Sequence, residues 1–492
     1  MSEHYTQLQQ RFEHHYLLRS AADMLEWDAQ TMMGAGSGDL RAAQLATLRV
    51  LAHQVLAAED LPELLHQAEQ APPADAWERA NLTAMRRAWI HAASVPSDLV
   101  EARTRAVSRC ELAWRSARKD DDFSRVRADL EEVLNLTRQL GAAKQGALGT
   151  SMYDALIDEY EPGIRTAFLT PLFAELRREL PPLIDRIVAR QTPAPALVGP
   201  FPIDAQARLG RALATQMGFD FSRGRMDVSA HPFCGGAAED VRMTTRYDED
   251  DFLSSVMGTV HETGHALYEM GLPRRWARQP VGQAIGMAMH ESQSLLMEMQ
   301  AARTRPFLRY LAAQASAAFG RAISEEALAA HALHVERSTI RVDADEATYP
   351  LHIVVRYELE RALIEDDLRM ADLPGAFHEQ MQAVVGTRAD SDRDGCLQDV
   401  HWPSGAYGYF PSYTLGAIAA AQLFAAAERA HPSLDGDLER GDFSALRAFA
   451  HEHVHQHGSR ESTQEVLVRA TGSPFDAGAL LTHLRRRYLQ DA

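Results

Sequence analysis

Residues 259–268, Thr-Val-His-Glu-Thr-Gly-His-Ala-Leu-Tyr, contain a His-Glu-x-x-His motif. Residues four apart on an α-helix share one face and lie about 6 Å apart along the axis, so the imidazoles of His261 and His265 can reach one metal ion. Glu262 follows His261 and would face the remaining metal position, where it could take a proton from a water molecule. The motif therefore predicts a metal site with a carboxylate base.

The residues around this motif favour a helix. Residues 248–251 are all acidic and lie where the positive dipole end of a first helical turn is expected. Apolar residues from Phe252 to Leu267 then recur at helical intervals, and Gly271-Leu272-Pro273 supplies a stop. A metal-binding helix is therefore expected here. The competing interpretation is a buried helix whose two histidines are satisfied in the core and bind no metal.

Composition sets limits on the rest of the chain. Of its 492 residues 46% are hydrophobic, and long runs without glycine or proline predict a mainly α-helical protein with a large core. Its 50 Lys and Arg residues against 68 Asp and Glu residues leave a formal charge of −18. Such a charge argues against nucleic acid and against an anionic membrane as partners.

Cysteine content and terminal sequence indicate the compartment. Cys110, Cys234 and Cys396 are odd in number and lack metal-type spacing, so a disulfide framework is not expected. The first residues have neither the basic nor the apolar region of a signal peptide, and no later segment offers the ~18 uninterrupted apolar residues of a membrane span. We therefore expect a cytoplasmic protein that is neither exported nor inserted into a membrane.

One catalytic unit is expected over residues 1–492. A proline-containing segment at residues 191–195 marks a possible subdivision into a helical part, residues 1–195, and a part with the metal motif, residues 196–492. The clearest strand patterns lie at residues 227–233 and 240–247, with Cys-Gly-Gly-Ala between them. They predict a small hairpin directly before the metal helix, and its open edge could pair with an extended peptide.

A zinc hydrolase needs three protein ligands and one position left for water, so a third ligand must be found. Glu269 shares a helical face with both motif histidines. However, eight helical residues put its Cα about 12 Å along the axis from His261, too far to close the same tetrahedron comfortably. A supporting or surface role therefore suits Glu269 better.

The next predicted helix offers two candidates for the third ligand. Glu291 is favoured, because a glutamate from a neighbouring helix commonly completes this type of zinc site. His290 is its rival, since adjacent helical residues diverge by about 100° and only one of the two can face the ion. Gly258 and Gly264 would let the two helices approach each other closely.

Several motifs follow one another along the chain: Trp27-Asp28 with Arg41, His231-Pro232-Phe233, residues 240–244, the His261–His265 motif, residues 290–293, residues 340–345 and residues 395–402. Together they resemble the thermostable (Taq-type) carboxypeptidases, zinc-dependent metallocarboxypeptidases of mostly helical fold. The resemblance runs almost from end to end and is specific because the motifs keep their order. The most visible departure is Met33-Gly34, where members often have Met-Pro, and it lies outside the expected site.

This resemblance implies that His261, His265 and Glu291 bind one zinc ion per chain and that Glu262 is the general base. It also implies release of C-terminal amino acids from peptides with broad side-chain tolerance, a homodimer, and a helical body split by a deep cleft. Zinc lowers the pKa of its water towards neutrality, and Glu262 would take the proton and pass it to the leaving amine. Cobalt is expected to substitute, since such ligand sets accept several divalent ions.

A tetrahedral oxyanion requires a hydrogen-bond donor besides the metal. By resemblance to related cleft-type peptidases, which use a histidine and tyrosines after the zinc motif, His401 and Tyr409 are the catalytic candidates. Tyr413 of the same loop is a candidate for substrate binding. The alternative is that these aromatic residues only pack in the wall of the cleft.

An exopeptidase must also recognise a free carboxylate, and an arginine can bind one through two parallel hydrogen bonds. Arg341 is the first candidate for this role and Arg242 the second. Either could instead form a structural ion pair, with Asp343, Asp345 or Asp240 as its partner.

Two other functions stay open at this point. A metallo-endopeptidase or dipeptidase of the same zinc class would share the motif and differ in whether the site is closed beyond the leaving residue. A helical binding protein with an inert metal motif would have no need of Glu262, because holding a metal requires no base.

Overall fold

The computed structural model describes residues 3–490. Over these residues the chain forms 20 α-helices and one three-stranded sheet, so the expected mainly α fold with a small sheet is confirmed. The chain divides into two units, each built from three segments: unit 1 comprises residues up to 92, 192–333 and 419–475, and unit 2 comprises residues 93–191, 334–418 and 476 onwards. The expected subdivision at residue 195 and the expected cleft stay predictions.

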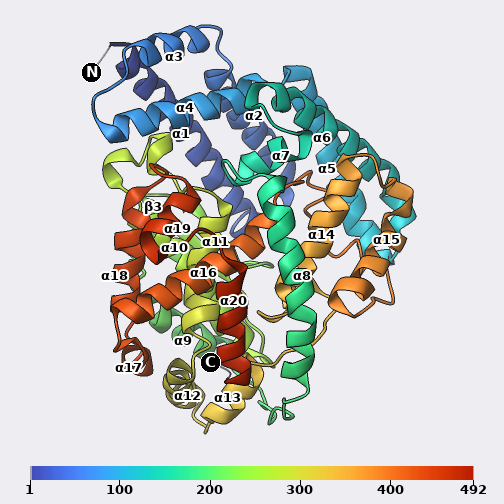
Figure 1. The fold of residues 1–492 in the computed structure, drawn as a ribbon, viewed down its shortest axis with the longest axis vertical. Helices are drawn as coiled ribbons and strands as arrows, with labels where there is room; N and C mark the ends of the chain where they lie inside the picture. Colours follow the sequence, from blue (N-terminus) through green and yellow to red (C-terminus); the bar gives the residue numbers. More distant parts are fainter. Residues whose placement is uncertain (1–2, 491–492) are drawn as a thin grey trace. The chain divides into compact units, whose positions relative to one another are not determined.

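The helices of each unit are shown in Figure 1. None of those within residues 3–490 combines the length and the apolar character that a bilayer crossing requires. Unit 1 contains α1 (Glu3–Thr31), α2 (Gly38–Leu56), α3 (Leu61–Gln70), α4 (Ala76–Ala93), α9 (Ile203–Met217), α10 (Phe252–Gly271), α11 (Met287–Leu295), α12 (Arg305–Phe319), α13 (Glu325–Ala332), α17 (Leu434–Glu439), α18 (Ser444–His453) and α19 (Thr463–Thr471). Unit 2 contains α5 (Ser97–Asp120), α6 (Arg127–Leu148), α7 (Met152–Tyr160), α8 (Thr166–Val188), α14 (Tyr349–Ile364), α15 (Leu373–Gln380) and α20 (Ala477–Leu484), while α16 (Pro411–Ala430) begins in unit 2 and ends in unit 1.

Helix α10 carries the His-Glu-x-x-His motif. Asp251 precedes its first turn, and the Asp251 side chain accepts a hydrogen bond from the backbone N–H of Ser254 at 3.1 Å. This cap satisfies one of the backbone donors that every helix start leaves free. The helix ends before Leu272-Pro273, as expected from the sequence. Within unit 1 it packs against α9, α11 and β3, and this packing buries most of the motif.

The small sheet beside α10 differs from the expected hairpin in its first strand. β1 (Gly224–Val228) pairs in parallel with β3 (Asp240–Thr245), and β2 (Cys234–Ala237) pairs with β3 in the antiparallel sense. The segment interpreted as a connection is therefore the strand β2, and most of residues 227–233 is not a strand. Glycine is uncommon inside strands, so the pair of glycines in β2 concealed it. The resulting order β1-β3-β2 leaves β2 at an edge.

Helices α10 and α11 meet closely at Gly264. A Cβ atom at this position would lie 2.5 Å from the backbone oxygen of Gln293 and 2.6 Å from the Cα of Ser294. Only glycine therefore permits this approach, and its expected role is confirmed. The same expectation for Gly258 is wrong, because a Cβ there would find no neighbouring segment of the described chain within 4 Å.

We expect Gly264→Ala to destabilise unit 1 by about 1–3 kcal/mol, because the added methyl group meets backbone atoms that cannot rotate away. Gly258→Ala is the matched control on the same helix. It should be neutral or should stabilise by up to about 1 kcal/mol, since alanine favours a helix over glycine. Urea denaturation followed by circular dichroism measures both. Equal stability of the two variants would contradict the close packing at Gly264.

Candidate metal centre

Three side chains from two helices converge on one point in unit 1. His261 and His265 come from α10, and Glu291 comes from α11. The Oε2 atom of Glu291 lies 3.8 Å from Nε2 of His261 and 3.4 Å from Nε2 of His265. One ligand atom from each of the three residues lies within 4.8 Å of the other two. The structure thus brings together the three residues expected to bind the metal.

The spacing of these atoms fits a small divalent cation. Ligands at about 2.0–2.1 Å from a tetrahedral zinc ion are separated from one another by about 3.3 Å, close to the two nitrogen–oxygen distances observed. Two imidazole nitrogens and one carboxylate oxygen form a donor set that zinc accepts, and three protein ligands leave a fourth position open. The residues present therefore fit such an ion without rearrangement.

The Nδ1 atom of His261 contacts a buried ion pair between Glu298 and Arg303. This Nδ1 atom lies 3.1 Å from Oε2 of Glu298, while the other oxygen of Glu298 accepts a hydrogen bond from Nη2 of Arg303 at 2.8 Å. A carboxylate on Nδ1 keeps the proton there and leaves Nε2 free to bind a metal. Glu298 was missed from the sequence, although it lies two helical turns beyond Glu291 and thus on a similar face. The backbone winds as a π-helix at Leu296–Ala301, and such turns are frequent at functional sites.

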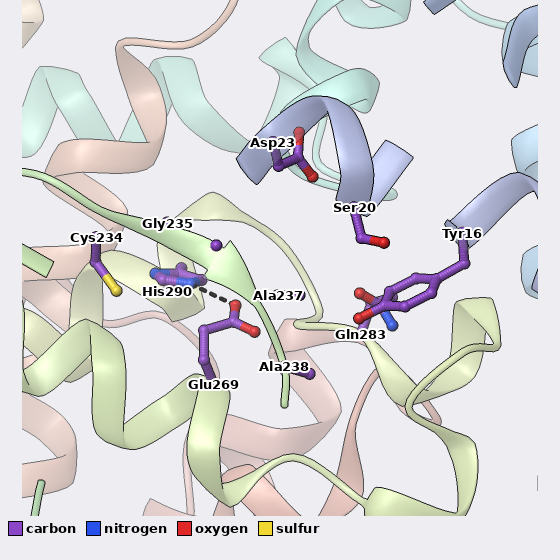
Figure 2. A pocket seen from close by; sticks show the side chains of 11 residues that line it. Tyr16, Ser20, Asp23, Cys234, Gly235, Ala237, Ala238, Glu269, Gln283 and His290 are labelled. Carbon is purple, nitrogen blue, oxygen red and sulfur yellow. Dashed lines mark hydrogen bonds and ion pairs between the residues drawn. The ribbon is translucent and has the colours of Figure 1, made fainter. Parts of the chain in front are cut away.

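His265 is held by a longer chain of hydrogen bonds. Its Nδ1 atom lies 2.6 Å from Nδ1 of His290, and Nε2 of His290 lies 2.9 Å from Oε1 of Glu269, a pair drawn dashed in Figure 2. If Nε2 of His265 binds the metal, its Nδ1 carries the proton, so His290 must accept there and donate to Glu269. Both ring nitrogens of His290 are therefore engaged, whereas Glu291 faces the two motif histidines, and Glu291 as the third ligand stays a prediction. Glu269 has the supporting position expected from the sequence.

Glu262 lies beside these residues and is only 6% exposed. Its Oε2 atom has no hydrogen-bond partner within residues 3–490. Burial, opposed by nearby His261 and reinforced by the carboxylate of Glu291, raises the pKa of Glu262 to about 7. A carboxylate with a raised pKa and a free oxygen is suited to accept a proton near neutral pH.

We expect Glu298→Gln to weaken metal binding by about 10- to 100-fold, the usual cost of losing a partner of a ligand histidine. An amide has one acceptor oxygen, so it cannot serve both His261 and Arg303. Competition with a chromophoric chelator at fixed pH measures the affinity. Glu326→Gln, at an exposed position of unit 1, is the control and should leave it unchanged. Wild-type affinity in Glu298→Gln would show that His261 does not depend on this contact.

Arg341 lies in unit 2, where it is 6% exposed and bound to an unexpected partner. Its Nε donates to Oδ1 of Asp399 at 2.8 Å, and its Nη1 lies 3.2 Å from the hydroxyl of Tyr349. The other oxygen of Asp399 accepts from Nε of Arg356 at 2.7 Å. The partners considered from the sequence for Arg341 were therefore wrong. The interaction spans 58 residues of chain, and no local spacing indicates it.

The other arginine candidate, Arg242, forms the ion pair with Asp240 that the sequence left open. Its Nη2 lies 2.7 Å from Oδ2 of Asp240, and its guanidinium stacks 4.4 Å from the ring centre of Trp27. Both interactions hold the side chain within unit 1. Its predicted part in substrate binding stays a prediction.

His401, Tyr409 and Tyr413 form one cluster in unit 2. Nε2 of His401 lies 3.1 Å from the hydroxyl of Tyr413, and the ring centres of Tyr409 and Tyr413 are 5.1 Å apart. Burial lowers the pKa of His401 to about 3, so its ring is neutral at physiological pH. The structure thus brings these three residues together within unit 2, and their predicted roles in the reaction stay predictions.

Comparison with known proteins relates this geometry to one family. The sequence model of the carboxypeptidase Taq (M32) metallopeptidase family matches residues 7–488. Thermostable carboxypeptidase 1 of Thermus thermophilus is 37% identical over 488 residues, which cover 96% of this chain and 95% of that protein. Two solved structures cover 99% of both chains: Trypanosoma cruzi metallocarboxypeptidase 1, with a TM-score of 0.96 and 36% identity, and the M32 carboxypeptidase from Deinococcus radiodurans, with a TM-score of 0.94 and 34% identity.

These matches extend over nearly the whole chain and agree with the metal-binding geometry of α10 and α11. The chain belongs to the carboxypeptidase Taq (M32) metallopeptidase family and is a metallocarboxypeptidase, a peptide hydrolase that depends on a divalent metal ion.

Proposed function

We propose that this chain is a zinc-dependent carboxypeptidase that releases C-terminal amino acids from peptides with broad side-chain tolerance. The observation that carries the proposal is the convergence of His261, His265 and Glu291 beside the buried carboxylate of Glu262. When bound there, zinc lowers the pKa of water and polarises the carbonyl group of the bond to be cut. A site with three ligands and an adjacent base has the composition that hydrolysis requires, whereas metal storage needs no base.

Some side chains of the site orient the two ligand histidines, and Glu262 transfers the proton. Glu298 and the His290–Glu269 pair orient the two ligand histidines from behind. The free oxygen of Glu262 takes the proton of the attacking water, and the same carboxyl group then delivers it to the leaving amine. Because water itself attacks, the reaction forms no covalent bond to the protein.

Metal analysis combined with an assay of C-terminal release tests this proposal. The substrate is an N-blocked peptide, offered with a free C-terminal carboxylate and as its C-terminal amide. A carboxypeptidase should release the last residue of the first, cut the amide at least ~100-fold more slowly because it lacks the recognised charge, and lose both activities to a chelator. Equal cleavage of the amide would favour the metallo-endopeptidase alternative. Unchanged turnover with the chelator present would overturn the metal mechanism.

The identity of the metal is part of the proposal. Two imidazoles and one carboxylate favour zinc, and such borderline ligand sets also accept cobalt. Reconstitution of metal-stripped protein with each ion should restore hydrolysis in both cases, with one ion bound per chain. Recovery by magnesium alone would contradict this assignment, since magnesium prefers oxygen ligands.

Assembly and location are also proposed. We infer a homodimer from the family resemblance, and the exposed apolar side chains of α2, Leu40, Val50 and Leu51, supply surface that could be covered. Light scattering at micromolar concentration should give twice the chain mass, and a monomer would exclude this inference.

A cytoplasmic location is proposed because all three cysteines are free thiols, as a reducing compartment would keep them.

A further inference from the structure

A pocket lies next to the candidate metal centre, within unit 1. It encloses about 550 Å³ of space, part of it open to solvent. Figure 2 shows its lining: Tyr16, Ser20 and Asp23 extend from α1, residues 234–238 form the strand side, and Glu269, Gln283 and His290 complete the wall. His290 is hydrogen-bonded to the ligand histidine His265. The pocket is therefore separated from a metal ligand by a single side chain.

The pocket presents two carboxylates, and no lysine or arginine side chain lines it in the described part of the chain. Asp23 has no hydrogen bond or ion pair with any residue in the described part of the chain. Arg19 and Arg49 act on its charge only from a distance, and burial outweighs them and raises the pKa of Asp23 above the usual value. Glu269 uses Oε1 to hold His290, which leaves its Oε2 available. A positively charged group placed between these carboxylates would relieve an unfavourable arrangement.

The same pocket contains an open strand edge. β2 pairs only with β3, so its other edge has no strand partner within residues 3–490. The backbone N–H of Thr244 donates to the carbonyl oxygen of Phe233, which lies just before β2. Since the bonded residues alternate along an antiparallel pair, Cys234 and Gly236 direct their backbone groups away from β3. An extended peptide can bind such an edge through its main chain and place a side chain beside it.

The sign of the charge determines which part of a peptide can enter. The last residue of a carboxypeptidase substrate carries a free carboxylate, which Asp23 and Glu269 would repel. A lysine or arginine side chain upstream of the bond that is cut, or the free amino group of a short peptide, carries the opposite charge and no terminal carboxylate beside it. A lysine or arginine at the leaving position would bring the repelled carboxylate with it, so the pocket suits a cationic group on the N-terminal side of the bond.

We propose that this pocket, with Asp23 and Glu269 as its charged groups, is a subsite that binds a cationic group of the peptide on the N-terminal side of the scissile bond. The proposal rests on the carboxypeptidase function proposed above. It assigns to α1 a part in substrate selection, because Asp23 of this helix lines the pocket without a direct ion-pair partner in the described residues. The enzyme should therefore favour peptides with a lysine, an arginine or a free amino group a few residues before the cleaved bond.

Paired substrates test this subsite. N-acetylated peptides carry lysine or its neutral counterpart norleucine at each of the three positions before the scissile bond, or at the leaving position, and one further pair differs in a free or acetylated N-terminus. We expect kcat/KM to be about fivefold higher for the charged member at one upstream position or at the N-terminus, chiefly through KM. The free amine and the side chain are thereby distinguished.

Asp23→Asn keeps the shape of the pocket and removes its charge, so the preference should fall to about onefold while kcat for the neutral peptides stays unchanged. Glu13→Gln is the matched control: it removes one negative charge of the same helix, ten residues before Asp23, at an exposed ion pair with Arg278, and it should keep the preference. Three results would overturn the proposal. The first is a wild-type preference near onefold at every upstream position, the second is a preference confined to the leaving residue, and the third is a preference that survives Asp23→Asn. Failure of the carboxypeptidase function itself would appear differently, as absence of C-terminal release from the neutral peptides as well.

Discussion

Replacing Glu262 with glutamine should lower kcat by about 10²- to 10⁴-fold while the protein still binds its metal. Proton transfer by a positioned side chain contributes a factor of this size, and an amide cannot accept the proton. The metal should remain because Glu262 is not one of the three converging ligands. The buried free oxygen that makes Glu262 a suitable base is replaced by a neutral group of the same size.

This result is measured as kcat on an N-blocked peptide together with the metal content of the same preparation. Glu298→Gln provides a contrast, because it should reduce metal affinity and regain activity when excess metal is added. Glu262→Gln should regain none. A metal-replete Glu262→Gln protein with wild-type turnover would show that another group accepts the proton.

The second large effect is expected on stability, from Asp399→Ala in unit 2. Asp399 is the shared partner of Arg341 and Arg356, and the latter is fully buried. Removing one member of a buried charge cluster leaves the others unpaired, which typically costs about 3–5 kcal/mol. The midpoint of urea unfolding should therefore fall strongly. Glu365→Ala is the control, since its pair with Arg361 is exposed and should contribute little.

The pH dependence of this cluster follows from its charges. Burial alone would raise the pKa of Asp399, but Arg341 and Arg356 hold it well below its usual value. A lowered folded pKa stabilises the protein above the unfolded pKa of about 3.9, and this contribution is lost as the pH falls below that value. The difference between wild type and Asp399→Ala should thus stay constant from pH 5 to 8 and narrow in acid. Equal unfolding midpoints for Asp399→Ala and Glu365→Ala at neutral pH would contradict the role of the cluster.

Local patterns in the sequence were sufficient for the elements that carry the metal centre. His261 and His265 are four residues apart, which places them on one face of a helix. The Gly271-Leu272-Pro273 sequence predicted the end of this helix, and α10 ends at Gly271. General ligand preferences favoured Glu291 over His290, and the family resemblance implied Glu291. The structure adds that Glu291 converges with the two histidines, whereas both ring nitrogens of His290 are engaged by His265 and Glu269.

Other features could not be found from local patterns. The strand β2 was hidden by its two glycines, whose conformational freedom makes them poor strand signals, and it exists because β3 supplies its hydrogen bonds. Gly258 and Gly264 are the same residue type on the same helix, and only the position of α11 makes one of them necessary.

The sequence by itself determined the helical class of this protein, the metal motif and the family, because helical spacing and ordered motifs are properties of the chain read locally. Tertiary structure alone decided which carboxylates support the histidines, that Asp399 pairs with Arg341 and Arg356, and that Asp23 faces the same pocket as Glu269. The physical reason is that these contacts join segments far apart in the chain. Their partners are selected by packing and by the cost of burying a charge alone, and neither depends on sequence spacing.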